Sequence, residues 1–174
     1  RRKLLDAIAE LNRLREDEVG DPEISTRIAA YEMAHRMQMS VPELTDVSGE
    51  PKSTFDLYGP DAKMPGSHAG NCLLARRLAE RGVRFIQIYH RGWDHHGGLP
   101  GRHAKIAKEV DQGSAALVLD LKQRGLFEET LLVFATEFGR KPDFSGDGRS
   151  HHPVCFSTVL AGGGTKAGFV HGKS

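Results

Sequence analysis

Two short stretches of the chain gather the side chains that could do chemistry. An Asp-His-His run at residues 94–96 stands between Gly92 and Gly97, a few residues after the apolar run at 83–89, and a His-His pair occupies residues 151–152. Carboxylate oxygens and imidazole nitrogens, with no thiolate nearby, are typical ligands of Zn, Mn or Fe in catalytic sites. The two stretches together predict a divalent metal site, and a hydrogen-bonded network of polar loop residues is the alternative.

Three further polar residues precede the second stretch. Glu137 comes two residues after another apolar run, at 130–135, and is a further candidate ligand. It could instead be a structural carboxylate paired with Arg140 or Arg149. These two arginines could also hold an oxyanion, because the planar guanidinium group matches phosphate or sulfate. No Ser or Cys has the sequence context of an activated nucleophile, so a catalytic nucleophile is not identified.

An α/β architecture would bring these residues together. The patterns predict two helices and three buried strands: helices at 70–81 and 102–124, and strands at 83–89, 130–135 and 156–160. A helix that ends in Arg-Gly is followed by an apolar run twice, which favours a parallel sheet covered by helices on both faces. Ligands bind beyond the carboxyl ends of such strands, where residues 94–96 and Glu137 stand.

The first 66 residues have a different character. Apolar residues recur at helical spacing in 3–16, and Asp21-Pro22 is a typical start for a second helix that extends to about Ser40. Prolines and glycines are frequent after this helix, which predicts a connector with one helical turn near 53–58. We therefore divide the chain into a helical cap or insertion with its connector at 1–66 and an α/β part at 67–174.

Charge and hydropathy narrow the classes of partner. The chain has 24 basic and 23 acidic residues and a net charge of +1, which gives no electrostatic footprint for nucleic acid. No apolar run has the length of about 18–20 residues that a membrane span needs. The basic start is followed by a charged amphipathic helix, which excludes an export signal in this stretch. Because the chain has no initiator Met, we expect it to be the later part of something longer.

Four motifs carry a resemblance to a known family: Trp-Asp-x-His from residue 93, Glu-Phe-Gly-Arg-x-Pro from 137, Gly-Arg-x-His-His-Pro from 148 and Leu-Ala-Gly-Gly-Gly from 160. They resemble a large bacterial family of unknown function, domain of unknown function fifteen-oh-one, whose members are often labelled sulfatase. That family is similar to the alkaline phosphatase and sulfatase superfamily. The resemblance implies a three-layer α/β/α fold with a mostly parallel sheet, and it implies that this chain is the C-terminal half of an exported or periplasmic protein.

Carried over by motif, the resemblance implies a divalent metal ion such as Zn, Mn or Ca with these ligands: Asp94, His96, Glu137 and His151. Adjacent side chains in an extended segment point in opposite directions, so His95 and His152 should face away from the site. Phe138 follows Glu137 where the superfamily has a His, so the second metal position lacks a usual ligand.

The function that the resemblance implies is hydrolysis of sulfate or phosphate esters, with this chain supplying part of the metal site. Arg140 or Arg149 would orient the anion of a small-molecule ester, and the nucleophile would lie upstream of this chain. The alternative is a non-catalytic relative that uses the same fold for binding or assembly in an exported complex. A Ser, Thr or Cys preceded by an Asp at a strand end upstream would favour the enzyme.

Overall fold

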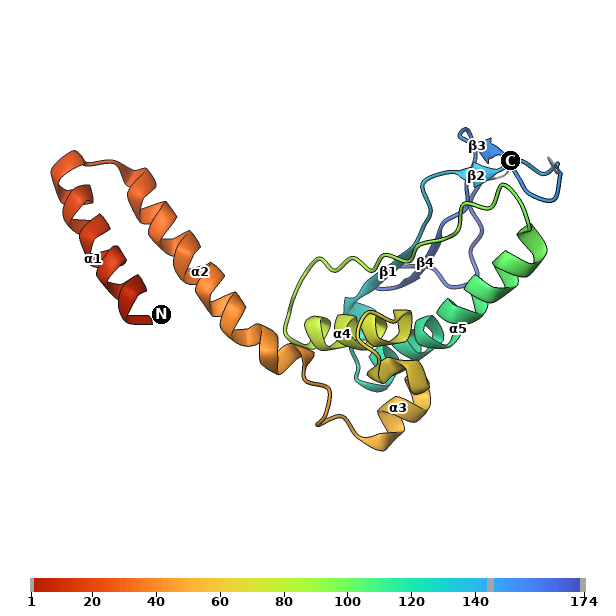
Figure 1. Cartoon of the computed structure of the whole chain (residues 1–174), viewed down its shortest axis with the longest axis horizontal. Helices are drawn as coiled ribbons and strands as arrows, with labels where there is room; N and C mark the ends of the chain where they lie inside the picture. The colour runs from red at the N-terminus through yellow and green to blue at the C-terminus, as the bar shows by residue number, and fades with distance from the viewer. Residues whose placement is uncertain (1, 144–145, 173–174) are drawn as a thin grey trace. The chain divides into compact units, whose positions relative to one another are not determined.

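The computed structural model describes residues 2–143 and 146–172, and its elements are mostly helices (Figure 1). By compactness the chain divides into two units, Arg1–Ser48 and Gly49–Ser174. Within the described residues, no helix is both long enough and apolar enough to cross a membrane.

The first unit is a pair of packed helices, α1 (Arg2–Val19) and α2 (Pro22–Thr45). The predicted start of the second helix is confirmed, because the Asp21 carboxylate accepts a hydrogen bond of 2.9 Å from the N–H of Glu23. α2 then continues beyond the predicted end near Ser40 and includes Pro42 in its last turns.

The second unit begins with its helical part: α3 (Lys52–Tyr58), the 3₁₀ turn η1 (Pro60–Lys63), α4 (His68–Glu80), α5 (Leu99–Gln123) and the 3₁₀ turn η2 (Phe127–Glu129). The helices expected at 70–81 and 102–124 are therefore confirmed as α4 and α5, and the helical turn near 53–58 as α3. Their contacts form the core, in which the largest almost completely buried side chains are those of Tyr58, Cys72, Leu73 and Leu121.

Close approach of α4 and α5 depends on a glycine. A Cβ atom at Gly113 of α5 would lie 2.9 Å from the Cα atom of Ala69 in α4, which is too close for ordinary contact. The absence of a side chain there lets the two helices pack tightly. The N-terminus of α4 is capped by Ser67, whose hydroxyl accepts a hydrogen bond of 2.9 Å from the N–H of Gly70.

A buried network of charges also joins the helices. The guanidinium of Arg76 on α4, whose side chain is 3% exposed, forms ion pairs with three carboxylates: Glu50 at 2.6 Å, Glu80 at 2.7 Å and Asp120 at 3.0 Å. Asp120 on α5 also accepts a hydrogen bond of 3.1 Å from the hydroxyl of Tyr58 on α3. The network therefore links α3, α4, α5 and the residues before α3.

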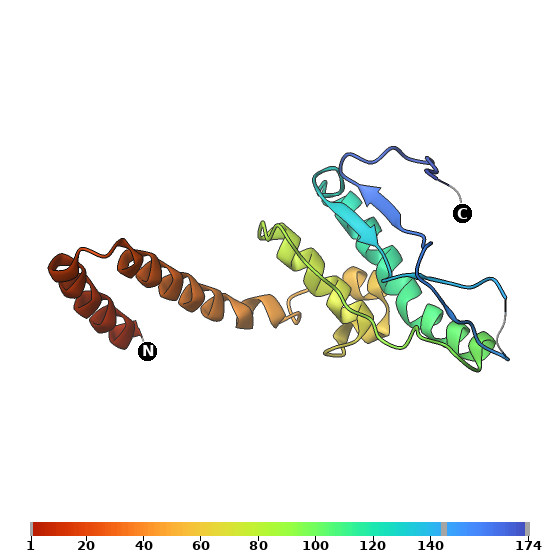
Figure 2. The ribbon, with the colours of Figure 1, turned by 90° about the horizontal axis from the view of Figure 1, so that it is seen from above.

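The predicted three-layer α/β/α fold with a mostly parallel sheet is wrong. The described strands form two small antiparallel pairs (Figure 1): β1 (Leu131–Phe134) with β4 (Val159–Gly162), and β2 (Gly139–Arg140) with β3 (His151–His152). Figure 2 shows the pair of β1 and β4 from above. The apolar run at 83–89 belongs to no strand, although Ile86 and Ile88 are more buried than the residues beside them. The strand predicted at 156–160 lies a few residues later, as β4.

The connection between β1 and β4 explains why they are antiparallel. Parallel neighbours need a crossover of a dozen or more residues, which is usually a helix. The described residues between Phe134 and Val159 form no helix, and they contain β2 and β3 instead. The chain therefore turns back on itself and pairs Phe134 with Val159 and Leu131 with Gly162. An apolar sequence indicates a strand, but it does not specify which partner the strand has.

Candidate metal centre

Two chain segments build the site, which we call the ligand loop (residues 92–98) and the hairpin (β2 with β3). The ligand loop leads into α5, and the hairpin follows β1. Two backbone hydrogen bonds join the ligand loop and the first residue of α5 to the segment before β3: Arg149 N–H to the carbonyl of His95 at 3.1 Å, and Leu99 N–H to the carbonyl of Asp147 at 2.9 Å. These bonds hold residues 94–96 beside His151 even though no parallel sheet is present.

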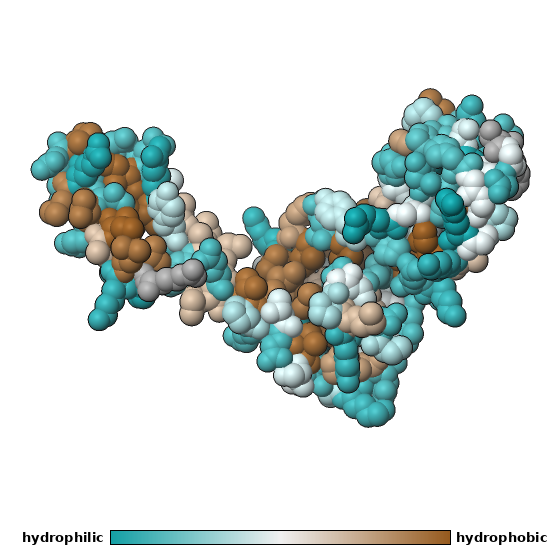
Figure 3. Space-filling model, in the orientation of Figure 1, coloured by the Kyte–Doolittle hydropathy of each residue, from teal (hydrophilic) through white to brown (hydrophobic). Residues whose placement is uncertain are grey.

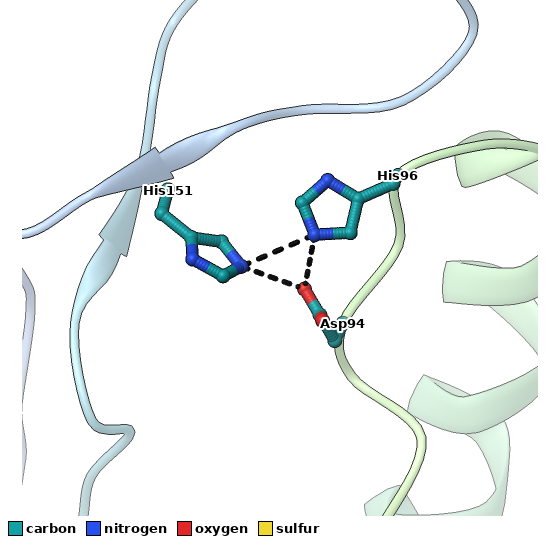
Figure 4. A group of neighbouring side chains, drawn as sticks. All are labelled: Asp94, His96 and His151. Atoms are coloured by element: carbon teal, nitrogen blue, oxygen red, sulfur yellow. Dashed lines mark hydrogen bonds and ion pairs between the residues drawn. The ribbon is translucent and has the colours of Figure 1, made fainter.

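Asp94, His96 and His151 point toward one another (Figure 4). The Asp94 Oδ1 atom lies 3.0 Å from Nε2 of His96 and 3.0 Å from Nε2 of His151, and the two Nε2 atoms are 3.1 Å apart. All three side chains are exposed, and within the described residues they are the one group of three or more His, Cys, Asp or Glu side chains close enough to share a metal ion. The site is therefore open to solvent on at least one side.

The distances suit a metal that contacts all three atoms. With bonds of about 2.0–2.1 Å, neighbouring ligand atoms lie about 3.3 Å apart in a tetrahedral site and about 2.9 Å apart on an octahedral face. The observed separations of 3.0–3.1 Å fall between these values. Three protein ligands leave at least one coordination position for water or another ligand.

Arg140 pairs with Glu137, as the alternative interpretation of Glu137 expected, and it also contacts Asp94, which the sequence did not indicate. Its Nη1 atom lies 2.5 Å from Oδ1 of Asp94, and its Nη2 atom lies 3.4 Å from Oε1 of Glu137. The hydrogen bond from His151, followed by that from Arg140, lowers the pKa of Asp94 to about 2. The carboxylate is therefore ionised at neutral pH, as a metal ligand has to be.

The other predicted site residues lie around this group. Glu137 is joined to it through Arg140 and is not a member of the three-residue cluster, so its predicted role as a ligand is not supported by the geometry. His95 is 5% exposed and directed into the protein, whereas its neighbour His96 faces the cluster. His152 is half-buried and lies beside His151 on β3. The backbone N–H of Arg149 donates a hydrogen bond to the carbonyl of His95 in the ligand loop.

Two residues support the site and were not expected to do so. The ring of Phe138 packs against the imidazole of His151, with ring centroids 4.4 Å apart, and fixes that side of the cluster. A Cβ atom at Gly148 would collide with the backbone of His96, so this glycine permits the ligand loop to approach the hairpin. Gly148 is the first residue of the Gly-Arg-x-His-His-Pro motif, and its place in that motif was the one sequence feature that could have indicated its role at the site.

The chain belongs to the family described as Protein of unknown function (DUF1501), whose match covers residues 1–174. No curated protein and no solved structure matches the chain. The predicted family is confirmed, while the likeness to the alkaline phosphatase and sulfatase superfamily and the position of this chain in a longer protein stay predictions. The family description assigns no activity, so a function has to be argued from the residues of the site.

Proposed function

We propose that this protein binds one divalent metal ion through Asp94, His96 and His151, and that this site serves in the hydrolysis of sulfate or phosphate esters. The observation that supports metal binding is the convergence of one carboxylate oxygen and two imidazole nitrogens, all within 3.0–3.1 Å of one another. His151 is separated from Asp94 by 57 positions in the chain, so sequence proximity alone does not explain the cluster.

The step from metal binding to ester hydrolysis has chemical support. A bound divalent metal would polarise an ester oxygen and stabilise the negative charge that develops during transfer. The guanidinium of Arg140 lies beside the three ligands and is suited to binding the oxygens of a sulfate or phosphate group. No residue of the chain has the sequence context of an activated nucleophile, so we expect this chain to bind such esters without turning them over.

Metal content after exhaustive dialysis tests the binding site. We expect Asp94→Ala, His96→Ala and His151→Ala each to lose the metal that the wild-type protein retains. His152→Ala is the matched control, because it removes the adjacent imidazole on β3 and should keep the metal. Equal metal content in all four variants would exclude the assignment.

Ester binding tests the proposed chemistry separately. The metal-loaded protein should bind 4-nitrophenyl sulfate or 4-nitrophenyl phosphate, and the metal-free protein should bind both more weakly. If calorimetry finds the same ester affinity for the metal-loaded and metal-free proteins, the metal site has no role in ester binding.

A second function, binding or assembly without catalysis, is favoured by one specific observation. Large apolar side chains are exposed on the unpaired run at 83–89 and on β1, including Phe85 at 78%, Tyr89 at 77% and Val133 at 55%. Apolar surface is visible over the region of α4 and the run that follows it (Figure 3). Exposed apolar patches often mark surfaces that bind other polypeptides. Analytical ultracentrifugation of the wild-type protein and Phe85→Ser would test this function.

A further inference from the structure

One carboxylate oxygen, Oδ1 of Asp94, has three neighbouring partners. The Asp94 Oδ1 atom lies within hydrogen-bonding or ion-pair distance of Arg140, His96 and His151. A carboxylate oxygen offers about two lone pairs, and a metal bound at Oδ1 would use one of them. Arg140 and a metal ion would therefore share the same oxygen atom.

Electrostatic repulsion opposes the simultaneous binding of Arg140 and a metal ion to Asp94. A guanidinium group 2.5 Å from Oδ1 and a divalent ion bonded to Oδ1 would place two cations within about 4 Å of each other. The repulsion falls when the guanidinium moves away from the carboxylate. Metal binding and release of Arg140 are therefore coupled.

The surroundings of Arg140 keep a released guanidinium near the site. Its Cζ atom lies 5.3 Å from the centroid of the Phe138 ring, and its Nη2 atom lies 3.4 Å from Glu137. Arg140 is part of β2, which pairs with the strand that carries His151. The guanidinium can thus leave Asp94 without leaving the neighbourhood of the open coordination position.

We propose that Arg140 couples the binding of the metal ion to the binding of a tetrahedral oxyanion. This inference rests on the proposed metal site and adds a regulation of that site. An oxyanion that pairs with the guanidinium removes the competitor from Asp94 and so raises the affinity for the metal. By linkage, the metal raises the affinity for the oxyanion by the same factor.

Isothermal titration with Mn²⁺ tests the coupling, in chloride medium and in media that contain sulfate or phosphate at matched ionic strength. For the wild-type protein we expect sulfate or phosphate to tighten Mn²⁺ binding about two- to fivefold, the scale of an exposed ion pair. Separate titrations in sulfate and in phosphate show whether one or both of these oxyanions raise the affinity for Mn²⁺. Chloride, which is not a tetrahedral oxyanion, is the reference.

Two substitutions of Arg140 separate its charge from its shape. Arg140→Met should bind Mn²⁺ about two- to fivefold more tightly than the wild-type protein in chloride and should show no effect of the oxyanions. Arg140→Lys keeps a competing charge but lacks the planar fork, so it should bind Mn²⁺ less tightly than Arg140→Met and should respond less to oxyanions than the wild-type protein. Lys108→Met removes one exposed positive charge from α5 and should behave as the wild-type protein does.

The outcomes distinguish this inference from the proposed function. Normal Mn²⁺ binding with no gain in Arg140→Met, or an oxyanion effect that persists in that variant, overturns the coupling and leaves the metal site intact. Absence of Mn²⁺ binding in the wild-type protein overturns both. Circular dichroism that matches the wild-type spectrum confirms that each variant is folded.

Discussion

Removal of Arg76 should strongly destabilise the second unit. The Arg76→Met substitution keeps an unbranched side chain of similar length and removes the charge. Because the Glu50 and Asp120 side chains are 7% and 6% exposed, neither carboxylate can recover full hydration in the folded protein. The substitution therefore leaves two buried negative charges with fewer partners.

The remaining partners set the size of the effect. Breaking a buried ion pair by removing one partner costs about 3–5 kcal/mol. Glu50 keeps an ion pair of 2.6 Å with Arg77, and Asp120 keeps one of 2.7 Å with Arg124. We therefore expect the lower end, about 3 kcal/mol, which corresponds to a decrease of about 10 °C in Tm for a unit of this size.

Urea unfolding followed by tryptophan fluorescence measures this change in one unit alone, because the protein has a single tryptophan, Trp93, and it lies in the second unit. Lys52→Met is the matched control, since Lys52 forms an ion pair with Asp56 in which the side chains are 88% and 60% exposed. The control should change the free energy of unfolding by less than about 1 kcal/mol. If Arg76→Met costs no more than Lys52→Met, the buried network does not stabilise the helices.

Three further expectations concern pH, thiol reactivity and the ligand loop. Burial lowers the pKa of His68, so the stability that its neutral form provides is present above the unfolded value of about 6.5 and is lost as the pH falls below it; His68→Gln should flatten this dependence in urea unfolding between pH 7 and 5. Burial raises the pKa of the Cys72 thiol to about 12, so a thiol reagent should label the half-buried Cys155 first and reach Cys72 only in urea; equal labelling rates in the native protein would contradict this. Gly148→Ala should force the ligand loop away from the hairpin and reduce bound metal, whereas Gly101→Ala, whose Cβ meets no atom within 4 Å, should not.

The helices could be predicted because their signals are local. The side chain of Asp21 caps α2 and that of Ser67 caps α4 within a few residues, and the periodicity of α5 is visible in its own sequence. The strand pairing could not be predicted in this way. The run at 83–89 has the composition of a buried strand, but a strand is defined by hydrogen bonds to a partner, and the sequence of one segment does not name that partner.

The candidate site shows the same division between local and long-range information. Few side-chain types bind metals without a thiolate, so Asp94, His96 and His151 could be selected by type and motif. The expected reason for their convergence, a shared edge of a parallel sheet, is wrong, and two backbone hydrogen bonds and a short hairpin bring them together instead. The contact of Arg140 with Asp94 depends on the direction of β2, which no local pattern encodes.

Different interactions hold the site and the helical core, so a substitution at the site can change metal binding without changing the stability of the core. The core depends on buried groups such as Leu73 and Arg76, whereas the three candidate ligands are exposed and lie on a loop and a two-residue strand. Exposed groups on short elements contribute little to folding free energy, so substituting a ligand should change metal binding far more than it changes unfolding. A ligand variant that loses its metal but keeps its unfolding midpoint therefore reports on the site itself, and a variant that loses both reports on the fold.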